Sequence, residues 1–178
     1  NTYVSNENTD LSINLAFNKK QADDRKEWLK QFDENKILDY NIPETKIEDF
    51  VNKELIHFSN ADTCRSIGSC LDGLKTSQRK ILYSCFKRKL YSEIRVAQLA
   101  GYVSENAAYH HGEASLQGTI IGMAQDFVGS NNINLLEPVG QFGSRLQGGK
   151  DAAQSRYIFT KLSKLTRLLY NEDDDVLC

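Results

Sequence analysis

The sequence predicts an α+β fold that is mainly helical, with one small sheet. Apolar residues recur at helical spacing over most of the 178 residues, which favours several amphipathic helices. Two short apolar runs, Ile133–Leu136 and Tyr157–Phe159, have the composition of strands. A glycine-rich stretch at residues 140–150 lies between these runs and predicts a long loop.

The first part of the chain is expected to be irregular and then helical. Residues 1–10 are polar and without pattern, so we expect them to be loosely ordered or to belong to a neighbouring element. A helix that Asn18 can cap is predicted through about Asn35. Residues 39–44, which include a proline, predict a connector, and residues 47–58 predict a short helix.

The central part of the chain has the start and stop signals of consecutive helices. Thr76 or Ser77 can cap a first helix with an apolar side and a basic side. A short helix at 96–100 is expected to stop at Gly101, and turn-like residues follow it. A further helix is predicted to start near His111. Its apolar stripe consists of Leu116, Ile120, Ile121, Ala124 and Phe127.

Two helices separated by a turn predict a helix-turn-helix, a motif whose second helix enters the major groove of DNA. Gly118 and Gly122 lie within this second helix, where each costs about 1 kcal/mol relative to alanine, so we expect close packing to favour them. With the two predicted strands and the loop between them as a wing, the pattern predicts a winged-helix domain with flanking helical segments. A last helix is expected from Leu162.

Charge and cysteine content limit the possible classes of protein. The 22 basic and 24 acidic residues nearly balance, which argues against nucleic-acid binding by bulk charge. Four cysteines without Cys-x-x-Cys spacing predict reduced thiols in a nuclear or cytosolic protein. No apolar stretch approaches the ~20 residues that span a bilayer, so no membrane partner is expected. A start at Asn1 and an acidic last stretch lead us to expect an internal fragment of a longer chain.

A local basic stripe stands out against this neutral balance. Its basic residues are Lys75, Arg79, Lys80, Lys87, Arg88, Lys89 and Arg95, and the one acid among them is Glu93. Such a stripe is typical of surfaces that neutralise phosphates. An isolated basic run is also a common solvated helix face, and both interpretations remain open at this point.

The dipeptide Arg156-Tyr157 after the glycine-rich stretch is the most informative feature of the sequence. A phenol, with a pKa near ~10, becomes a phosphoryl-transfer nucleophile only beside positive charge that stabilises the phenolate. Arg156 supplies such a charge, and glycine amides can approach a phosphate closely. The competing interpretation is an ordinary half-buried tyrosine in a strand.

Several short motifs extend this observation along the chain. In order they are Tyr109-His-His-Gly-Glu113, Phe127-Val-Gly-Ser-Asn-Asn132, Pro138-Val-Gly-Gln-Phe-Gly143, Gly148-Gly-Lys-Asp151 and Arg156-Tyr-Ile-Phe159. Upstream of them are Asp24-Arg-Lys-Glu-Trp-Leu29, Phe58-Ser-Asn60, Arg65-Ser-Ile67 and Asp72-Gly-Leu-Lys-Thr-Ser-Gln-Arg-Lys80. This ordered series resembles the DNA breakage-reunion core of eukaryotic-type DNA topoisomerase II, a type IIA topoisomerase. The resemblance runs from about Leu15 to Tyr170.

The resemblance implies three parts of the chain and a catalytic site. Residues 1–45 would be a linker and helix after a metal-binding (Toprim) domain, residues 46–160 would form the winged-helix breakage-reunion domain, and residues 161–178 would start a tower region. The implied catalytic residues are Tyr157 as nucleophile, with Arg156, Arg65 and His111 around the scissile phosphate. The implied DNA-binding residues are Lys75, Arg79, Lys80, His110 and Lys150.

Metal binding is the usual alternative for adjacent histidines. His110 and His111 diverge by about 100° if they lie on a helix, and no further ligand stands at the right spacing, so we expect no metal site. The resemblance implies that Mg²⁺ and ATP act in the full-length enzyme and bind outside this chain. It also implies double-stranded DNA as substrate and a homodimer as the functional unit, so the fragment alone should be inactive.

The sequence departs from the family pattern at a few positions. Gly68 and Thr76 stand where prolines are expected, Ala108 replaces a serine, and Ser155 replaces a proline. No charged or nucleophilic group is lost by these changes. They indicate a divergent lineage. The resemblance implies the nucleus as the location, or a viral or cytoplasmic replication site if the source is a large DNA virus. The alternative function is a winged-helix module that binds DNA without chemistry.

Overall fold

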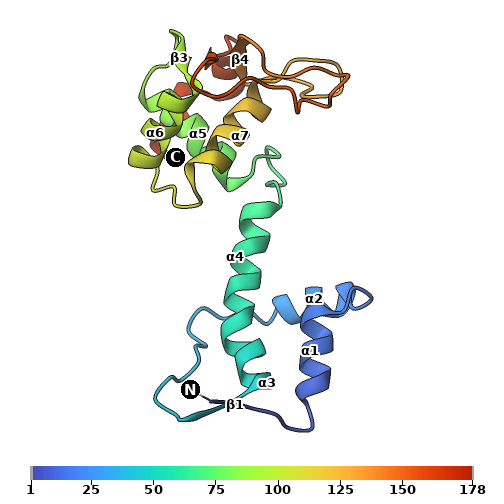
Figure 1. The fold of residues 1–178 in the computed structure, drawn as a ribbon. Coiled ribbons are helices and arrows are strands. Elements are labelled where there is room, and N and C mark those ends of the chain that lie inside the picture. Colours follow the sequence, from blue (N-terminus) through green and yellow to red (C-terminus); the bar gives the residue numbers. More distant parts are fainter. Residues whose placement is uncertain (1, 178) are drawn as a thin grey trace. The chain divides into compact units, whose positions relative to one another are not determined.

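The computed structural model describes residues 2–177, and their contacts divide them into two compact units. The first unit ends at Gly68 and the second begins at Ser69. The predicted boundary between residues 45 and 46 lies inside the first unit. As predicted, the fold is α+β, with many helices and little sheet (Figure 1).

The first unit consists of two short strands and a set of helices. The elements are β1 (Thr2–Val4), α1 (Thr9–Phe17), α2 (Ala22–Leu29), β2 (Glu44–Lys46), α3 (Ile47–Phe50), the π-helical turn η1 (Val51–Leu55) and α4 (Ile56–Ser66). Strands β1 and β2 pair in parallel. Trp28, Val51 and Ile56 form the buried core, and the Trp28 indole donates to Asn52 Oδ1 at 3.0 Å.

Of the two expectations for residues 1–10, loose order is wrong, whereas membership of neighbouring elements is confirmed, since Thr2–Val4 form β1 and Thr9 begins α1. The polar residues there make specific hydrogen bonds. The Asn6 amide donates to Thr9 Oγ1 at 2.8 Å at the start of α1. The side chain of Asn8 donates to Glu48 Oε2 at 3.2 Å, which ties this turn to α3. Hydrogen bonds of this kind leave no hydrophobic periodicity in a sequence.

The helices of the first unit differ from their predicted bounds. Helix α2 ends at Leu29 rather than near Asn35, and Gln21, not Asn18, precedes it. The predicted helix at residues 47–58 continues to Ser66 and passes through the π turn. Residue 44 of the predicted connector is already part of β2.

The second unit contains the predicted helices and a three-stranded antiparallel sheet. Its elements are α5 (Thr76–Lys87), β3 (Ile94–Arg95), α6 (Val96–Asn106), α7 (Glu113–Ala124), β4 (Leu136–Val139), β5 (Phe159–Leu162), α8 (Thr166–Leu169) and the 3-10 turn η2 (Glu172–Leu177). The strand order is β3-β5-β4. The loop between β4 and β5, orange in Figure 1, extends away from the sheet.

One apolar core holds the second unit together. Its largest fully buried side chains are Ile81, Leu99, Leu116, Ile120, Leu136 and Ile158, which come from α5, α6, α7, β4 and the residues before β5. Burying each such side chain stabilises the fold by about 1.5–3 kcal/mol. The core therefore fixes the surface loops between these elements.

The helices of the second unit also correct several expectations. Lys75, rather than Thr76 or Ser77, is the residue before α5, and its amide donates to Gln78 Oε1 at 2.9 Å. Helix α6 does not stop at Gly101 but runs to Asn106. Leu99, Ala100 and Val103 are fully buried on this helix. Their burial outweighs the helix cost of one glycine, about 1 kcal/mol.

Close packing does not explain the glycines of α7. A Cβ atom built on Gly118 or Gly122 would meet no atom within 4 Å. The expectation of a tight contact at these positions is therefore wrong. The Cβ positions of both glycines face open space instead.

The strands and the last helix lie later in the chain than predicted. Strand β4 begins at Leu136 and β5 begins at Phe159, so Tyr157 lies outside the sheet. Helix α8 is a single turn that starts at Thr166, because the residues from 159 to 162 form β5. The Thr166 hydroxyl donates to the Leu135 carbonyl at 2.6 Å and fixes this turn. No helix within residues 2–177 is long and apolar enough to span a membrane.

Candidate functional site

Tyr157 lies in the turn that leads into β5, and the residue is 65% exposed. Its amide donates to the Gln154 carbonyl at 2.9 Å, which closes the turn. The next residue, Ile158, is fully buried and belongs to the core of the second unit. The guanidinium carbon of Arg156 lies 4.8 Å from the centre of the Tyr157 ring. The core thus anchors a surface phenol beside a permanent positive charge.

A chain of hydrogen bonds joins this turn to α7. The Ser155 hydroxyl donates to Gln117 Oε1 at 2.7 Å, and Gln117 Nε2 donates to Glu113 Oε1 at 2.7 Å. The Ser155 carbonyl accepts from the Ala97 amide of α6 at 3.1 Å. A proline at 155, which the family pattern favours, would lack the hydroxyl that makes the first bond. Gln117 was missed from the sequence, although its spacing of four from Glu113 on one helix face was a signal.

His110 and His111 are exposed in the loop before α7. Gly112 ends this loop with a φ of 91°, a conformation that glycine adopts readily. Tyr109 is buried, and its ring contacts the His111 ring edge to face, with the centroids 5.6 Å apart. The Tyr109 hydroxyl donates to Ser115 Oγ at 3.3 Å. These contacts place both imidazoles near the amino end of α7, where unpaired amides favour an anion.

The predicted DNA-binding residues of α5 already have partners within the chain. The Arg79 guanidinium pairs with the Asp72 carboxylate at 2.8 Å. Lys80 Nζ donates to the Ala108 carbonyl at 2.8 Å, in the loop that carries the histidines. An exposed ion pair such as that of Arg79 is worth about 0–1 kcal/mol, so a phosphate can compete for it.

The loop between β4 and β5 is closed tightly on itself. A Cβ atom on Gly143 would lie 2.6 Å from Gly149 Cα, so the two arms approach more closely than side chains allow. Gln125, the residue after α7, donates to the carbonyls of Phe142 and Gly149 at 2.8 and 3.2 Å. Lys150 is exposed on this loop.

A carboxylate holds the same loop from inside. Asp151 Oδ1 accepts from the Ser144 amide at 2.8 Å, and Oδ2 accepts from Gln141 Nε2 at 3.3 Å. The bond from the Ser144 amide lowers the pKa of Asp151 from its ordinary value. The loop therefore presents its basic residues from a defined backbone.

Arg65 belongs to the first unit, in the last turn of α4. Its guanidinium pairs with the Asp62 carboxylate at 2.6 Å. Within the second unit the structure brings Arg156 to Tyr157, and Lys80 to the loop of His111. The convergence of all four predicted catalytic residues stays a prediction.

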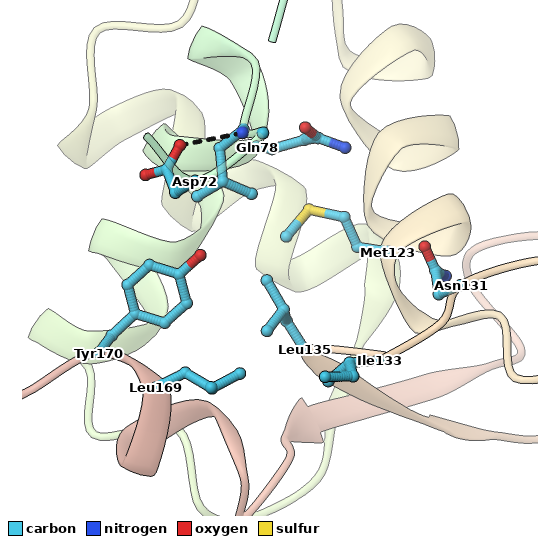
Figure 2. Close-up of a pocket in the computed structure, with 10 residues that line it drawn as sticks. Asp72, Gln78, Met123, Asn131, Ile133, Leu135, Leu169 and Tyr170 are labelled. Carbon is cyan, nitrogen blue, oxygen red and sulfur yellow. Dashed lines mark hydrogen bonds between the residues drawn. The ribbon is translucent and has the colours of Figure 1, made fainter. Parts of the chain in front are cut away.

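A cavity of about 280 Å³ lies elsewhere in the second unit (Figure 2). It is lined by Asp72, Gly73, Leu74, Gln78, Met123, Asn131, Ile133, Leu135, Leu169 and Tyr170. In Figure 2 the Tyr170 hydroxyl points toward the Asp72 side of the cavity. Burial raises the pKa of Tyr170, and the Asp72 charge adds to this effect. None of the predicted site residues lines the cavity.

Family models match both parts of the chain. Residues 65–178 match the model for the A-type subunit of DNA gyrase and topoisomerase IV. Residues 1–63 match the C-terminal associated domain of TOPRIM.

Curated relatives match nearly the whole chain. A DNA topoisomerase 2 of Candida albicans is 64% identical over 93% of this chain, and that of Saccharomyces cerevisiae is 62% identical over 93%. Human DNA topoisomerase 2-alpha is 58% identical over 93%. The chain spans 11–12% of the length of these relatives.

A solved structure matches the fold as well. The DNA-binding, cleavage and re-ligation domain of Plasmodium falciparum topoisomerase II matches with a TM-score of 0.81 at 56% identity. The match covers 98% of this chain and 24% of that one.

Proposed function

This chain belongs to the type IIA DNA topoisomerase family, and on that premise we propose that it supplies the tyrosine site for DNA cleavage and religation. The whole enzyme would make a transient double-strand break and pass a second duplex through it, driven by ATP. The observation that carries the proposal is the exposed Tyr157 ring beside the Arg156 guanidinium, on a turn anchored by the buried Ile158.

In the proposed reaction the Tyr157 oxygen attacks a DNA phosphodiester. A bond forms between the phenol oxygen and phosphorus, and the bond from phosphorus to the 3′ oxygen breaks. The phenol proton is released, and the 3′ oxygen leaves as a hydroxyl. The resulting 5′-phosphotyrosyl link is still a phosphodiester, so the reverse attack reseals the strand without another energy source.

Positive charge near the phosphorus is the contribution that we assign to the other catalytic residues. Arg156 would stabilise the charged oxygens in the transition state, together with Arg65 and His111. We assign contacts with the phosphate backbone of DNA to Lys75, Arg79, Lys80, His110 and Lys150. The ion pair of Arg79 with Asp72 is weak enough to open when a phosphate arrives.

We infer that α5, β3, α6, α7, β4 and β5 form a winged helix. The antiparallel order β3-β5-β4 and the long loop after β4 support this assignment. In it, α7 is the recognition helix and residues 140–158 form the wing. Residues 1–45 would come after the metal-binding domain, and residues 161–178 would lead toward the tower.

Metal and nucleotide chemistry belong elsewhere in this proposal. Within residues 2–177, no three His, Cys, Asp or Glu side chains are grouped so that they could hold a metal ion. We assign Mg²⁺ and ATP to parts of the enzyme outside this chain, as the resemblance to the family implies. We further propose a homodimer that acts on double-stranded DNA in the nucleus, or at a viral or cytoplasmic replication site if the source is a large DNA virus.

Replacing Tyr157 by phenylalanine in the full-length enzyme tests the proposal. The variant keeps the ring that stacks on Arg156, so DNA affinity should stay near normal, while no covalent protein-DNA adduct should form on detergent quenching. Tyr102→Phe is a matched control, because Tyr102 also stacks on an arginine, Arg88, at 5.0 Å. A normal adduct from Tyr157→Phe would favour a winged-helix module that binds DNA without chemistry.

A further inference from the structure

The turn before the two histidines has an unusual backbone. Ala108 has a φ of 46°, in the left-handed region that residues with a side chain rarely adopt. Ala108 directly follows Ala107, the C-cap residue of α6, at a position where many helices end in a left-handed residue, usually glycine. Alanine adopts this conformation less readily than glycine, so a contact to Ala108 would help to hold it.

Lys80 makes that contact from a different helix. Its Nζ donates to the Ala108 carbonyl at 2.8 Å, across a sequence separation of 28. A hydrogen bond from a charged donor is stronger than one between neutral groups, so this contact opposes the strain at Ala108. The family pattern has serine at position 108. Because the acceptor is the backbone carbonyl, the contact does not depend on whether alanine or serine stands there.

The strained turn fixes the residues that come after it. Tyr109 is 8% exposed and its hydroxyl donates to Ser115 in the first turn of α7. The His111 ring contacts the Tyr109 ring edge to face, with the two planes at 80°. The position of the His111 imidazole thus depends on the direction in which the chain leaves Ala108.

We propose that Lys80 is a positioning residue, whose ammonium holds the left-handed turn at Ala108 and thereby orients His111. This role differs from the phosphate contact that the sequence implies for Lys80. An ammonium has three donors, so the two roles do not exclude each other chemically, and experiment can separate them. The consequence for DNA cleavage rests on the proposed function, whereas the link from Lys80 to His111 does not.

NMR of the 178-residue chain tests the link without DNA. The chain has three histidines, so imidazole signals of His111 can be assigned among few. Lys80→Met removes the ammonium but keeps most of the aliphatic stem, and should shift or broaden the His111 ring signals. Lys87→Met, on the same helix, is the control that should leave them in place. Unchanged His111 signals in folded Lys80→Met would overturn the proposal.

A second substitution, at Ala108, separates loss of the left-handed turn from other effects of Lys80→Met on the fold. Glycine adopts a positive φ without strain, so Ala108→Gly should keep the turn even when the ammonium is absent. The double variant Lys80→Met/Ala108→Gly should therefore regain much of the native His111 signal pattern, and Lys80→Arg should retain it. If Lys80→Met does not fold, the double variant decides: native signals support the proposal, and displaced signals contradict it.

The full-length enzyme shows whether the orientation matters for chemistry. At saturating DNA, Lys80→Met should lower the maximal rate of cleavage by about 10-fold to 100-fold, as expected for a displaced catalytic group. Ala108→Gly should restore part of that rate. A salt slope reduced by about 1, with a normal cleavage rate, would instead identify Lys80 as a phosphate contact only. Normal cleavage with shifted His111 signals would count against the proposed role of His111 and leave the structural link intact.

Discussion

At the scale of single residues, the buried thiol of Cys85 shows how well the core of the second unit excludes water. Cys85 has no exposed surface, and burial raises its pKa to about 12. The thiolate is the reactive form, so a raised pKa removes reactivity at neutral pH. The folded pKa lies above the unfolded value of ~8.5. Below about pH 8.5 the thiol is neutral in both states, and its burial stabilises the folded state. This contribution is lost as the pH rises from there toward 12.

We expect Cys85 to resist alkylation while the protein is folded. Exposed Cys70 should react with iodoacetamide at pH 8, and Cys85 should react only after denaturant is added. Peptide mass spectrometry measures both sites in one sample. Equal rates for the two thiols in the native protein would show that the core opens far more readily than its packing indicates.

The second unit has two kinds of glycine, for which substitution by alanine is expected to change the stability of the fold in opposite directions. Gly118 has helical geometry and open space around its Cβ position, so Gly118→Ala should stabilise the chain by about 0.5–1 kcal/mol. Gly143 has a φ of 106°, and its Cβ would meet the backbone of Gly149. Gly143→Ala should destabilise the wing by about 2 kcal/mol or more. Thermal unfolding of both variants measures the contrast.

Gly118→Ala has a second expected effect if α7 is the recognition helix. Its exposed backbone would lie against DNA, where an added methyl group reduces close approach. The full-length variant should then bind DNA more weakly although the chain itself is more stable. A gain in stability without loss of affinity would place the DNA on another face of the unit.

At the scale of elements, the wing depends on one carboxylate. Asp151 accepts the Ser144 amide, and this bond lowers its pKa. A depressed folded pKa means that the stabilisation is present above the unfolded value of ~3.9 and is lost as the pH falls through the folded value. Asp151→Asn should weaken the same bond wherever the carboxylate of the parent chain is ionised, including neutral pH.

Hydrogen exchange of the Ser144 amide measures this dependence. Its protection should fall below about pH 4 in the parent chain and should already be low in Asp151→Asn at pH 7. Amides inside α7 serve as the reference for general unfolding. A Ser144 amide that stays as protected in the variant as in the parent would assign the loop closure to Gln125 alone.

Elements with strong local signals were predictable, and elements held by distant contacts were not. The approximate start of α7 and the buried face of α5 follow from hydrophobic periodicity. Helix α6 was predicted too short, because burial of Val103 outweighs the local signal of Gly101. Strand β1 was missed, since its partner β2 lies about forty residues later in the chain.

The candidate site shows the same division. Arg156 and Tyr157 are adjacent in the sequence, so their pairing needed no tertiary information. The exposure of Tyr157 did need it, because burial of Ile158 decides which way the turn faces. The bond from Lys80 to Ala108 could not be predicted either, since nothing in either residue type specifies a partner so far along the chain.

At the scale of the whole molecule, each unit has a core of its own. The first is built around Trp28, Val51 and Ile56, and every residue of the larger core belongs to the second unit. Domains with separate cores can unfold independently. We therefore treat the two units as separate folding units.

Denaturant titration should reveal two transitions. The single tryptophan, Trp28, is buried in the first unit, so its fluorescence follows that unit alone. Pulse alkylation of Cys85 follows the second unit in the same samples. We expect different midpoints for the two signals, whereas coincident curves would indicate one cooperative domain.

The two hydrogen bonds of Gln125 give the second unit a mechanical property. Gln125 directly follows α7 and grips both arms of the wing, at Phe142 and Gly149. A displacement of the wing must therefore either move the end of α7 as well or break these two bonds. In the proposed complex, a duplex that bends against the wing would act on α7 as on the short arm of a lever.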